Sequence, residues 1–200
     1  MKKNGTFLHV GCGSKTKQHT PFSSSDWKEI RLDINQKTNP DIIGTMLNME
    51  NVKDKSVDAV LSSHNLEHVY PHEVEIALKE FKRVLKDTGF LLVTCPDLES
   101  VCSLVADNKL TETAYTSSIG PITPLDILYG HRVSIAMGNH YMAHKCGFTS
   151  KTLNKDILLA GFSQVATAKG NNFDLWALGT CSMWEKDKLV DVCNTLFKKP

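Results

Sequence analysis

Short apolar runs that stop at glycine, acidic or polar residues recur through the first half of the chain. Residues 6–10 run into Gly11-Cys12-Gly13, residues 28–32 stop at Asp33, and residues 56–62 stop at Ser63-His64. Apolar runs of this length, bounded by turn-forming residues, are typical of buried strands. The same pattern predicts strands at 41–43 and 90–94.

The clearest helical periodicity follows Pro71. Apolar residues recur three and four positions apart from Val74 to Leu85, which is the spacing of one helix face, and Gly89 predicts the end of the helix. Residues 98–106 predict a second helix. Thr149-Ser150 and Gly161 bracket a third helix, and the apolar positions of 189–197 predict a last one.

Two further runs, 164–168 and 173–178, are separated by Lys169-Gly170-Asn171-Asn172 and predict a β-hairpin. Strands and helices therefore alternate along most of the chain. That order predicts an α/β fold with a parallel sheet, helices on both faces and a terminal antiparallel hairpin at its edge. Ligands of such sheets bind beyond the carboxyl ends of the central strands.

Residues 108–147 have no clean period and contain several Gly and Pro breaks. We interpret 1–200 as a single domain in which 108–147 is an irregular insertion on the substrate side. A long irregular segment in a compact domain is typical of a functional loop. We expect it to form a mobile cover that selects the substrate.

Composition narrows the function classes. The chain has 200 residues, 41% hydrophobic and 22% charged, with 23 Lys and Arg against 22 Asp and Glu. This balance is typical of a globular domain, and a net charge of +1 provides no footprint for binding nucleic acid. No apolar window is long enough for a membrane span or a signal core, so we expect a cytoplasmic protein. The six cysteines form no C-x-x-C pair, which predicts reduced thiols.

The residues at the strand ends suit a nucleoside. Gly11 and Gly13 permit a tight turn, and Asp33, twenty residues after Gly13, can accept hydrogen bonds from ribose hydroxyls. A dinucleotide enzyme would need a third glycine where Thr16 stands and a helix within 14–26, which lacks helical period. S-adenosylmethionine, which has no phosphate, fits better. Two glycines and an acid also occur at ordinary strand-end turns, and that alternative stays open.

Five segments resemble class I S-adenosylmethionine-dependent methyltransferases in order and spacing. They are Leu8-His9-Val10-Gly11-Cys12-Gly13, the run 27–33, Ser62-Ser63-His64-Asn65-Leu66-Glu67-His68-Val69, Phe81-Lys82-Arg83-Val84-Leu85-Lys86 and Pro96-Asp97-Leu98-Glu99. The resemblance implies a Rossmann-like fold with a mostly parallel seven-stranded sheet. It also implies S-adenosylmethionine as cofactor and S-adenosylhomocysteine as product.

The resemblance also assigns roles to individual residues. It implies that Gly11, Cys12 and Gly13 lie against the methionine part of the cofactor, that Asp33 holds the ribose and that Ile34 packs on adenine. Asn48 and Met49 correspond to contacts with the adenine edge, and Ser63 and His64 line the sulfonium side.

The chain departs from the family pattern at three places. His9 stands in place of an acid, Asn48 in place of a frequent Asp, and Lys86-Asp87-Thr88-Gly89 in place of Lys-Pro-Gly-Gly. All three departures favour, as an alternative function, a degenerate methyltransferase fold that acts as a non-catalytic binding or regulatory module.

The segment His64-Asn65-Leu66-Glu67-His68 also matches the H-x-x-E-H motif of the inverted zincins, which needs two histidines one helical turn apart. Pro71 ends the helix that this arrangement would need, and the resemblance to methyltransferases already accounts for the residues from His64 to His68. We therefore expect no metal site, and we interpret Glu67 and His68 as a hydrogen-bond network at a helix start.

Methyl transfer from a sulfonium is an in-line displacement in which positioning provides most of the rate. A hydroxyl or amine acceptor would also need a base, and His64 at the end of its strand is the best placed. His140 and His144 are candidates from the insertion. We expect the acceptor to be a small molecule or a sugar or lipid precursor, and the sequence makes no prediction of oligomeric state.

Overall fold

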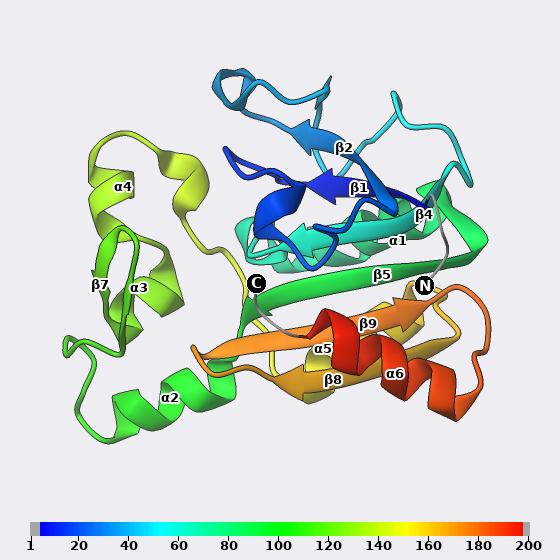
Figure 1. Cartoon of the computed structure of the whole chain (residues 1–200). Helices are drawn as coiled ribbons and strands as arrows, with labels where there is room; N and C mark the ends of the chain where they lie inside the picture. The colour runs from blue at the N-terminus through cyan, green and yellow to red at the C-terminus, as the bar shows by residue number, and fades with distance from the viewer. Residues whose placement is uncertain (1–4, 198–200) are drawn as a thin grey trace.

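The computed structural model describes residues 5–197 and contains the predicted sheet (Figure 1). Seven strands are ordered β3-β2-β1-β4-β5-β9-β8. Neighbouring strands from β3 to β5 are parallel, whereas β9 is antiparallel to both β5 and β8. The strands are β1 (Gly5–Val10), β2 (Trp27–Asp33), β3 (Ile42–Ile43), β4 (Val57–Ser63), β5 (Leu85–Pro96), β8 (Gln164–Lys169) and β9 (Asp174–Thr180).

Helices cover both faces of this sheet, as predicted. On one face, α1 (Val74–Val84) and α5 (Ser150–Leu159) pack over a core that includes Leu8 and Val60. On the other face, α6 (Lys186–Leu196) and the aromatic side chains of Phe22 and Trp27 close a second core. Alternate residues of β1 belong to different cores, as the two-residue period of a strand requires.

The sheet reverses its direction of growth between β1 and β4. The chain adds β2 and β3 outward on one side of β1, then returns to place β4 on the other side. In open parallel sheets the crevice at such a reversal is where ligands bind. The carboxyl ends of β1, β2 and β4, at Val10, Asp33 and Ser63, meet at this edge.

The insertion contains more structure than its irregular pattern predicts. After α2 (Leu98–Ala106), it contains a two-stranded sheet and three short helices, and its Ile122 and Ile127 form a small core with Val101 of α2. Its elements are β6 (Tyr115–Ser117), β7 (Gly120–Ile122), α3 (Pro124–Tyr129), α4 (Arg132–Ala136) and the 3-10 helix η5 (His140–Met142). Each is at most six residues long, too short for a period to show in the sequence. This group lies beyond the carboxyl ends of the parallel strands (Figure 1).

Three of the 3-10 helices, with three residues each, lie in the loops near the carboxyl ends of the strands or before α1. They are η1 (Lys17–His19), η3 (Leu66–His68) and η4 (Pro71–Glu73). The segment between β1 and β2 contains only η1, as its lack of helical period predicts. The helix predicted to run from Pro71 to Gly89 is shorter than expected, because Leu85 already pairs with Val57 of β4.

Within residues 5–197, no helix combines the length and apolar character needed to cross a membrane.

Candidate functional site

A glycine turn follows β1 and is tied directly to the end of β2. Gly11 and Gly13 have φ angles of +65° and +55°, a left-handed conformation that residues with a side chain rarely adopt. The backbone N–H of Gly13 donates to Oδ2 of Asp33 at 2.7 Å, and the N–H of Gly11 donates to the carbonyl of Leu32 at 2.9 Å. The glycine residues and the acid predicted from spacing thus form one structural unit.

Asp33 stands at the edge of this turn with capacity for further hydrogen bonds. Its Oδ1 accepts from the N–H of Asn35 at 2.8 Å, and its side chain is largely buried. Each carboxylate oxygen can accept more than one hydrogen bond, so ribose hydroxyls can still be bound. The next residue, Ile34, is 51% exposed although it is a large apolar side chain. A flat apolar ligand group could therefore pack on Ile34 next to Asp33.

Arg31 stabilises the loop that bears the turn. Its guanidinium donates to the carbonyls of Gly13 at 2.7 Å, Lys15 at 3.1 Å and Asn39 at 2.8 Å. One side chain of β2 therefore fixes the loop after β1 and the loop after β2 together. The sequence analysis did not identify Arg31, because a basic residue in a strand has no spacing signal of its own.

A carboxylate of the neighbouring strand lies beside His9. His9 is buried, and its Nδ1 lies 2.8 Å from Oε1 of Glu29 on β2. Burial lowers the pKa of His9 despite the carboxylate beside it. Glu29 also accepts from the backbone N–H of Lys17 at 2.8 Å. Glu29 thus connects His9 on β1 with the loop that follows the glycine turn.

Asn48 and Met49 lie in the loop after β3. Asn48 is exposed, whereas Met49 is 1% exposed and belongs to the core. The N–H of Met49 is bonded to Oε2 of Glu80 at 2.7 Å. Of the two side chains, only that of Asn48 is therefore accessible to a ligand.

At the end of β4, Ser63 and His64 face different partners. The hydroxyl of Ser63 is 2.9 Å from that of Thr94. His64 has a φ angle of +48° and stands between two carboxylates, with Nδ1 3.5 Å from Glu67 Oε1 and Nε2 3.3 Å from Asp174 Oδ1. Desolvation opposes its charge, but Asp174 and Glu67 together raise the pKa of His64 to about 9. His64 is therefore a cation at neutral pH.

The insertion brings His144 next to η3. The Nδ1 of His144 is 2.9 Å from the carbonyl of Ile127, and the rings of His144 and His68 meet edge to face at 5.0 Å. Burial lowers the pKa of His144, so this ring is neutral at pH 7. His140, on η5, is exposed. His64 and His144 thus differ in charge, and His140 is the exposed one of the three predicted catalytic histidines.

Two thiols adjoin the site without being reactive: Cys12 is buried and Cys146 is half-buried. Burial raises the pKa of Cys12 to about 11 and that of Cys146 to about 12. Because only the thiolate is a nucleophile, both cysteines are inert at neutral pH.

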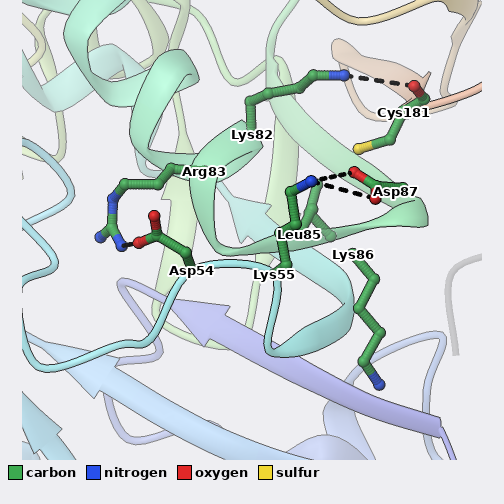
Figure 2. Close-up of a pocket in the computed structure, with 8 residues that line it drawn as sticks. All are labelled: Asp54, Lys55, Lys82, Arg83, Leu85, Lys86, Asp87 and Cys181. Atoms are coloured by element: carbon green, nitrogen blue, oxygen red, sulfur yellow. Dashed lines mark hydrogen bonds and ion pairs between the residues drawn. The ribbon is translucent and has the colours of Figure 1, made fainter.

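Two pockets lie at the opposite edge of the sheet. The pocket in Figure 2 has a volume of about 230 Å³ and adjoins the starts of β4 and β5. Its charged side chains include paired ones, such as Lys55 with Asp87 at 2.8 Å and Arg83 with Asp54. A second pocket of about 490 Å³ is lined by the aromatic side chains of Trp27, Phe90 and Trp184 together with polar and charged residues. Neither pocket includes a residue of the glycine turn.

Residues 8–93 match the family model described as a methyltransferase domain. These residues include the glycine turn, Asp33 and the end of β4. No curated protein sequence matches the chain.

Solved structures share the fold at low sequence identity. A possible histamine N-methyltransferase from Thermotoga maritima is 20% identical, with a TM-score of 0.54 over 89% of this chain and 82% of that one. A methyltransferase from Methanosarcina mazei is 16% identical, with a TM-score of 0.59 over 90% and 94%. The 1,6-didemethyltoxoflavin-N1-methyltransferase of Burkholderia thailandensis, solved with S-adenosylhomocysteine, is 12% identical, with a TM-score of 0.56 over 89% and 71%.

Proposed function

We propose that this chain is a class I S-adenosylmethionine-dependent methyltransferase that transfers a methyl group to a small acceptor. Its fold and the match of residues 8–93 to a methyltransferase domain support this proposal. S-adenosylmethionine is the methyl donor, and S-adenosylhomocysteine is the product that leaves.

The observation that supports this proposal most directly is the bond between the Gly13 N–H and Asp33 at the point where the sheet reverses. It holds an open turn and a carboxylate side by side, with exposed Ile34 next to them. We assign the methionine part of the cofactor to Gly11, Cys12 and Gly13, the ribose to Asp33 and the adenine to Ile34. We also assign Asn48 to the adenine edge, whereas Met49 is a core residue and contributes no exposed side chain.

The departures from the family pattern do not favour a non-catalytic role. Glu29 of the adjacent strand supplies, beside His9, the carboxylate that position 9 lacks, and it supports the same turn. The turn Lys86-Asp87-Thr88-Gly89 lies away from the glycine turn, and its Lys86 and Asp87 line the pocket of Figure 2. Catalysis therefore remains the function that the site favours.

On the acceptor side we assign Ser63 and His64 to the surroundings of the transferred methyl. As a cation, His64 can donate a hydrogen bond to an acceptor oxygen but cannot take up its proton. The neutral ring of His144 suits a proton acceptor better, and exposed His140 remains a second candidate on the insertion.

The insertion is the segment that we expect to select the acceptor. Large apolar side chains are exposed on it, including those of Tyr129, Val133, Met137 and Tyr141. Such side chains favour an acceptor with an apolar part, such as a lipid precursor, over a purely hydrophilic sugar.

The cysteines also bear on where the protein works. All six are free thiols, which fits the reducing conditions of the cytoplasm.

Isothermal titration calorimetry with S-adenosylmethionine, S-adenosylhomocysteine and NAD tests the cofactor assignment. We expect the first two to bind and NAD not to bind. Asp33→Ala should weaken S-adenosylmethionine binding by about 1–3 kcal/mol, because ribose hydroxyls lose a charged acceptor.

Asp41→Ala is the matched control for Asp33→Ala. Asp41 is an exposed carboxylate that also accepts a backbone N–H, that of Arg31 at 2.8 Å. This control should bind the cofactor as the unchanged protein does. Equal affinity in the Asp33 and Asp41 variants would remove Asp33 from the site, and binding of NAD alone would replace the methyltransferase assignment.

A further inference from the structure

Three potential metal ligands converge beside the candidate site from distant parts of the chain. Glu67 and His68 lie on η3, and His144 is supplied by the end of the insertion. One ligand atom of each lies within 4.8 Å of the other two. The backbone fixes this approach, because the N–H of Lys145 donates to the carbonyl of Glu67 at 2.8 Å.

Both histidines are oriented in the way that metal-binding imidazoles usually are. The Nδ1 of His68 lies 3.1 Å from the carbonyl of Ala143, and the Nδ1 of His144 lies 2.9 Å from that of Ile127. A carbonyl oxygen can only accept, so each Nδ1 donates its hydrogen, which leaves Nε2 of each ring as the nitrogen that can bind a metal. A hydrogen bond to the other ring nitrogen is the outer contact that orients histidine ligands of metals.

Glu67 is a buried carboxylate whose hydrogen bonds are missing. Its side chain is 1% exposed, and within residues 5–197 neither of its oxygens has a hydrogen-bond partner. His64 Nδ1, at 3.5 Å from Oε1, is an ion-pair neighbour. Buried carboxylates without hydrogen bonds are costly, and coordination of a metal is one way in which proteins offset that cost.

We propose that Glu67, His68 and His144 bind a divalent transition-metal ion, with Zn²⁺ as the first choice. Two imidazoles and one carboxylate form a common ligand set of zinc sites that keep a position open. Zinc bonds of ~2.0–2.2 Å require the three donors to draw together by roughly an ångström, which side-chain rotations can supply. This proposal replaces our expectation from the sequence that the chain has no metal site.

The arrangement differs from that of the inverted zincins. In that motif His64 and His68 would both bind the metal and Glu67 would act as base. Here His64 has left-handed backbone torsions and faces Asp174 and Glu67, while His144 takes the place of the second histidine. Glu67 is a ligand in this site.

The site adjoins the glycine turn. Asn65, two residues before Glu67, donates to the carbonyl of Val10 at 3.3 Å, and its amide fills the space where a Cβ on Gly11 would stand. We therefore expect the open metal position to take an oxygen of the methyl acceptor. With the metal bound, His144 acts as a ligand and no longer as the proton acceptor, and the metal itself lowers the pKa of the bound oxygen. This role rests on the proposed methyl transfer, whereas metal binding itself does not.

The test uses the full chain with Cys102→Ser, which removes an exposed thiol that could bind zinc by itself. After treatment with a chelator and dialysis, we expect calorimetry with ZnCl₂ to show one ion per chain in the absence of S-adenosylmethionine. CoCl₂ should give the visible absorption bands of low-symmetry cobalt coordinated by nitrogen and oxygen.

Ligand variants locate the ion. His68→Ala and His144→Ala should each weaken zinc binding at least tenfold, and Glu67→Gln should do so without changing the size of the side chain. His72→Ala, at an exposed histidine on η4, is the matched control and should bind zinc normally. Circular dichroism should show that each variant remains folded. Because the two histidines lie on different segments, either variant can test the site if the other fails to fold.

Two outcomes would overturn the proposal. One is less than half an ion bound per chain at saturating zinc. The other is zinc affinity unchanged in the folded histidine variants. Zinc binding without any binding of S-adenosylmethionine would support the metal site and contradict the proposed function, so the two failures are distinguishable.

Discussion

Gly11 and Gly13 share a left-handed backbone, yet each requires glycine for a different reason. A Cβ on Gly11 would overlap the side-chain amide of Asn65, so the position is closed by a neighbouring side chain. A Cβ on Gly13 would meet no atom within 4 Å. The open space at Gly13 is therefore the part of the turn that a cofactor can fill.

Gly13→Val tests this interpretation, with Gly138→Val as its matched control. Gly138, on the insertion, has a φ angle of +89° and equally open surroundings. Left-handed torsions should cost each variant roughly 1–2 kcal/mol of unfolding free energy. Only Gly13→Val should lose S-adenosylmethionine binding in calorimetry, because its branched side chain enters the cofactor's space. Equal binding by both variants would make the turn purely structural.

At the residue scale, the sequence predicts the glycine turn and Asp33 but not the contact between Glu67 and His144. Gly11, Gly13 and Asp33 follow from strand ends and a twenty-residue interval, and the structure joins them by a hydrogen bond. His144 and Glu67 are 77 positions apart, and no spacing rule brings them together. Their contact depends on how the insertion folds back onto η3.

The sequence predicts the long helices and strands well, because a repeat shows over several turns or residues. It does not predict the short elements. The helix expected over 98–106 is confirmed with the same bounds as α2. The end of α1 was misplaced, since pairing of Leu85 with Val57 outweighs the helical signal there. The strands and helices of the insertion have at most six residues, and tertiary contacts determine them.

Asp126 is the residue that stabilises α3 within the insertion. It is 7% exposed, accepts from Nε of Arg132 at 2.8 Å and also accepts from the N–H of Thr123 at 3.1 Å. Desolvation favours its neutral form, but the bonds from Arg132 and Thr123 outweigh this effect and hold the pKa of Asp126 well below its ordinary value of 3.8.

Asp126→Asn should therefore destabilise the insertion in a pH-dependent manner. A carboxyl whose pKa is lowered by folding contributes stability above its unfolded pKa and loses it as the pH falls through the folded value. At pH 7 the variant should show faster amide exchange in α3, equivalent to about 1–2 kcal/mol. The difference should shrink as the pH falls below about 4. A difference of the same size at pH 3 would mean that the charge of Asp126 is not the cause.

Over the whole molecule, the site is built from two parts with different origins. The sheet supplies the glycine turn, Asp33 and Ile34, which are held by contacts among β1, β2 and the loops that follow them. The insertion supplies His144, which is held by the carbonyls of Ile127 and Tyr129 at 2.9 and 3.2 Å. Cofactor binding and acceptor chemistry should therefore be separable by changing the insertion alone.

Replacement of residues 112–138 by a flexible Gly-Ser linker tests this separation. The replacement removes β6, β7, α3 and α4, including both carbonyls that orient His144. Calorimetry should find S-adenosylhomocysteine bound within about threefold of its original affinity, because the turn, Asp33 and Ile34 are unchanged. Zinc binding should weaken at least tenfold, because His144 loses its orientation and two histidine ligands no longer converge.

Thermal unfolding is the control for this replacement, since Val101 loses its contacts with Ile122 and Ile127. A cooperative transition would show that the sheet folds without the insertion's own core. Loss of cofactor binding in a protein that still unfolds cooperatively would contradict the division, because it would make the insertion part of the nucleoside site. Zinc affinity unaffected by the replacement would show that η3 alone binds the metal, and it would remove His144 from the site.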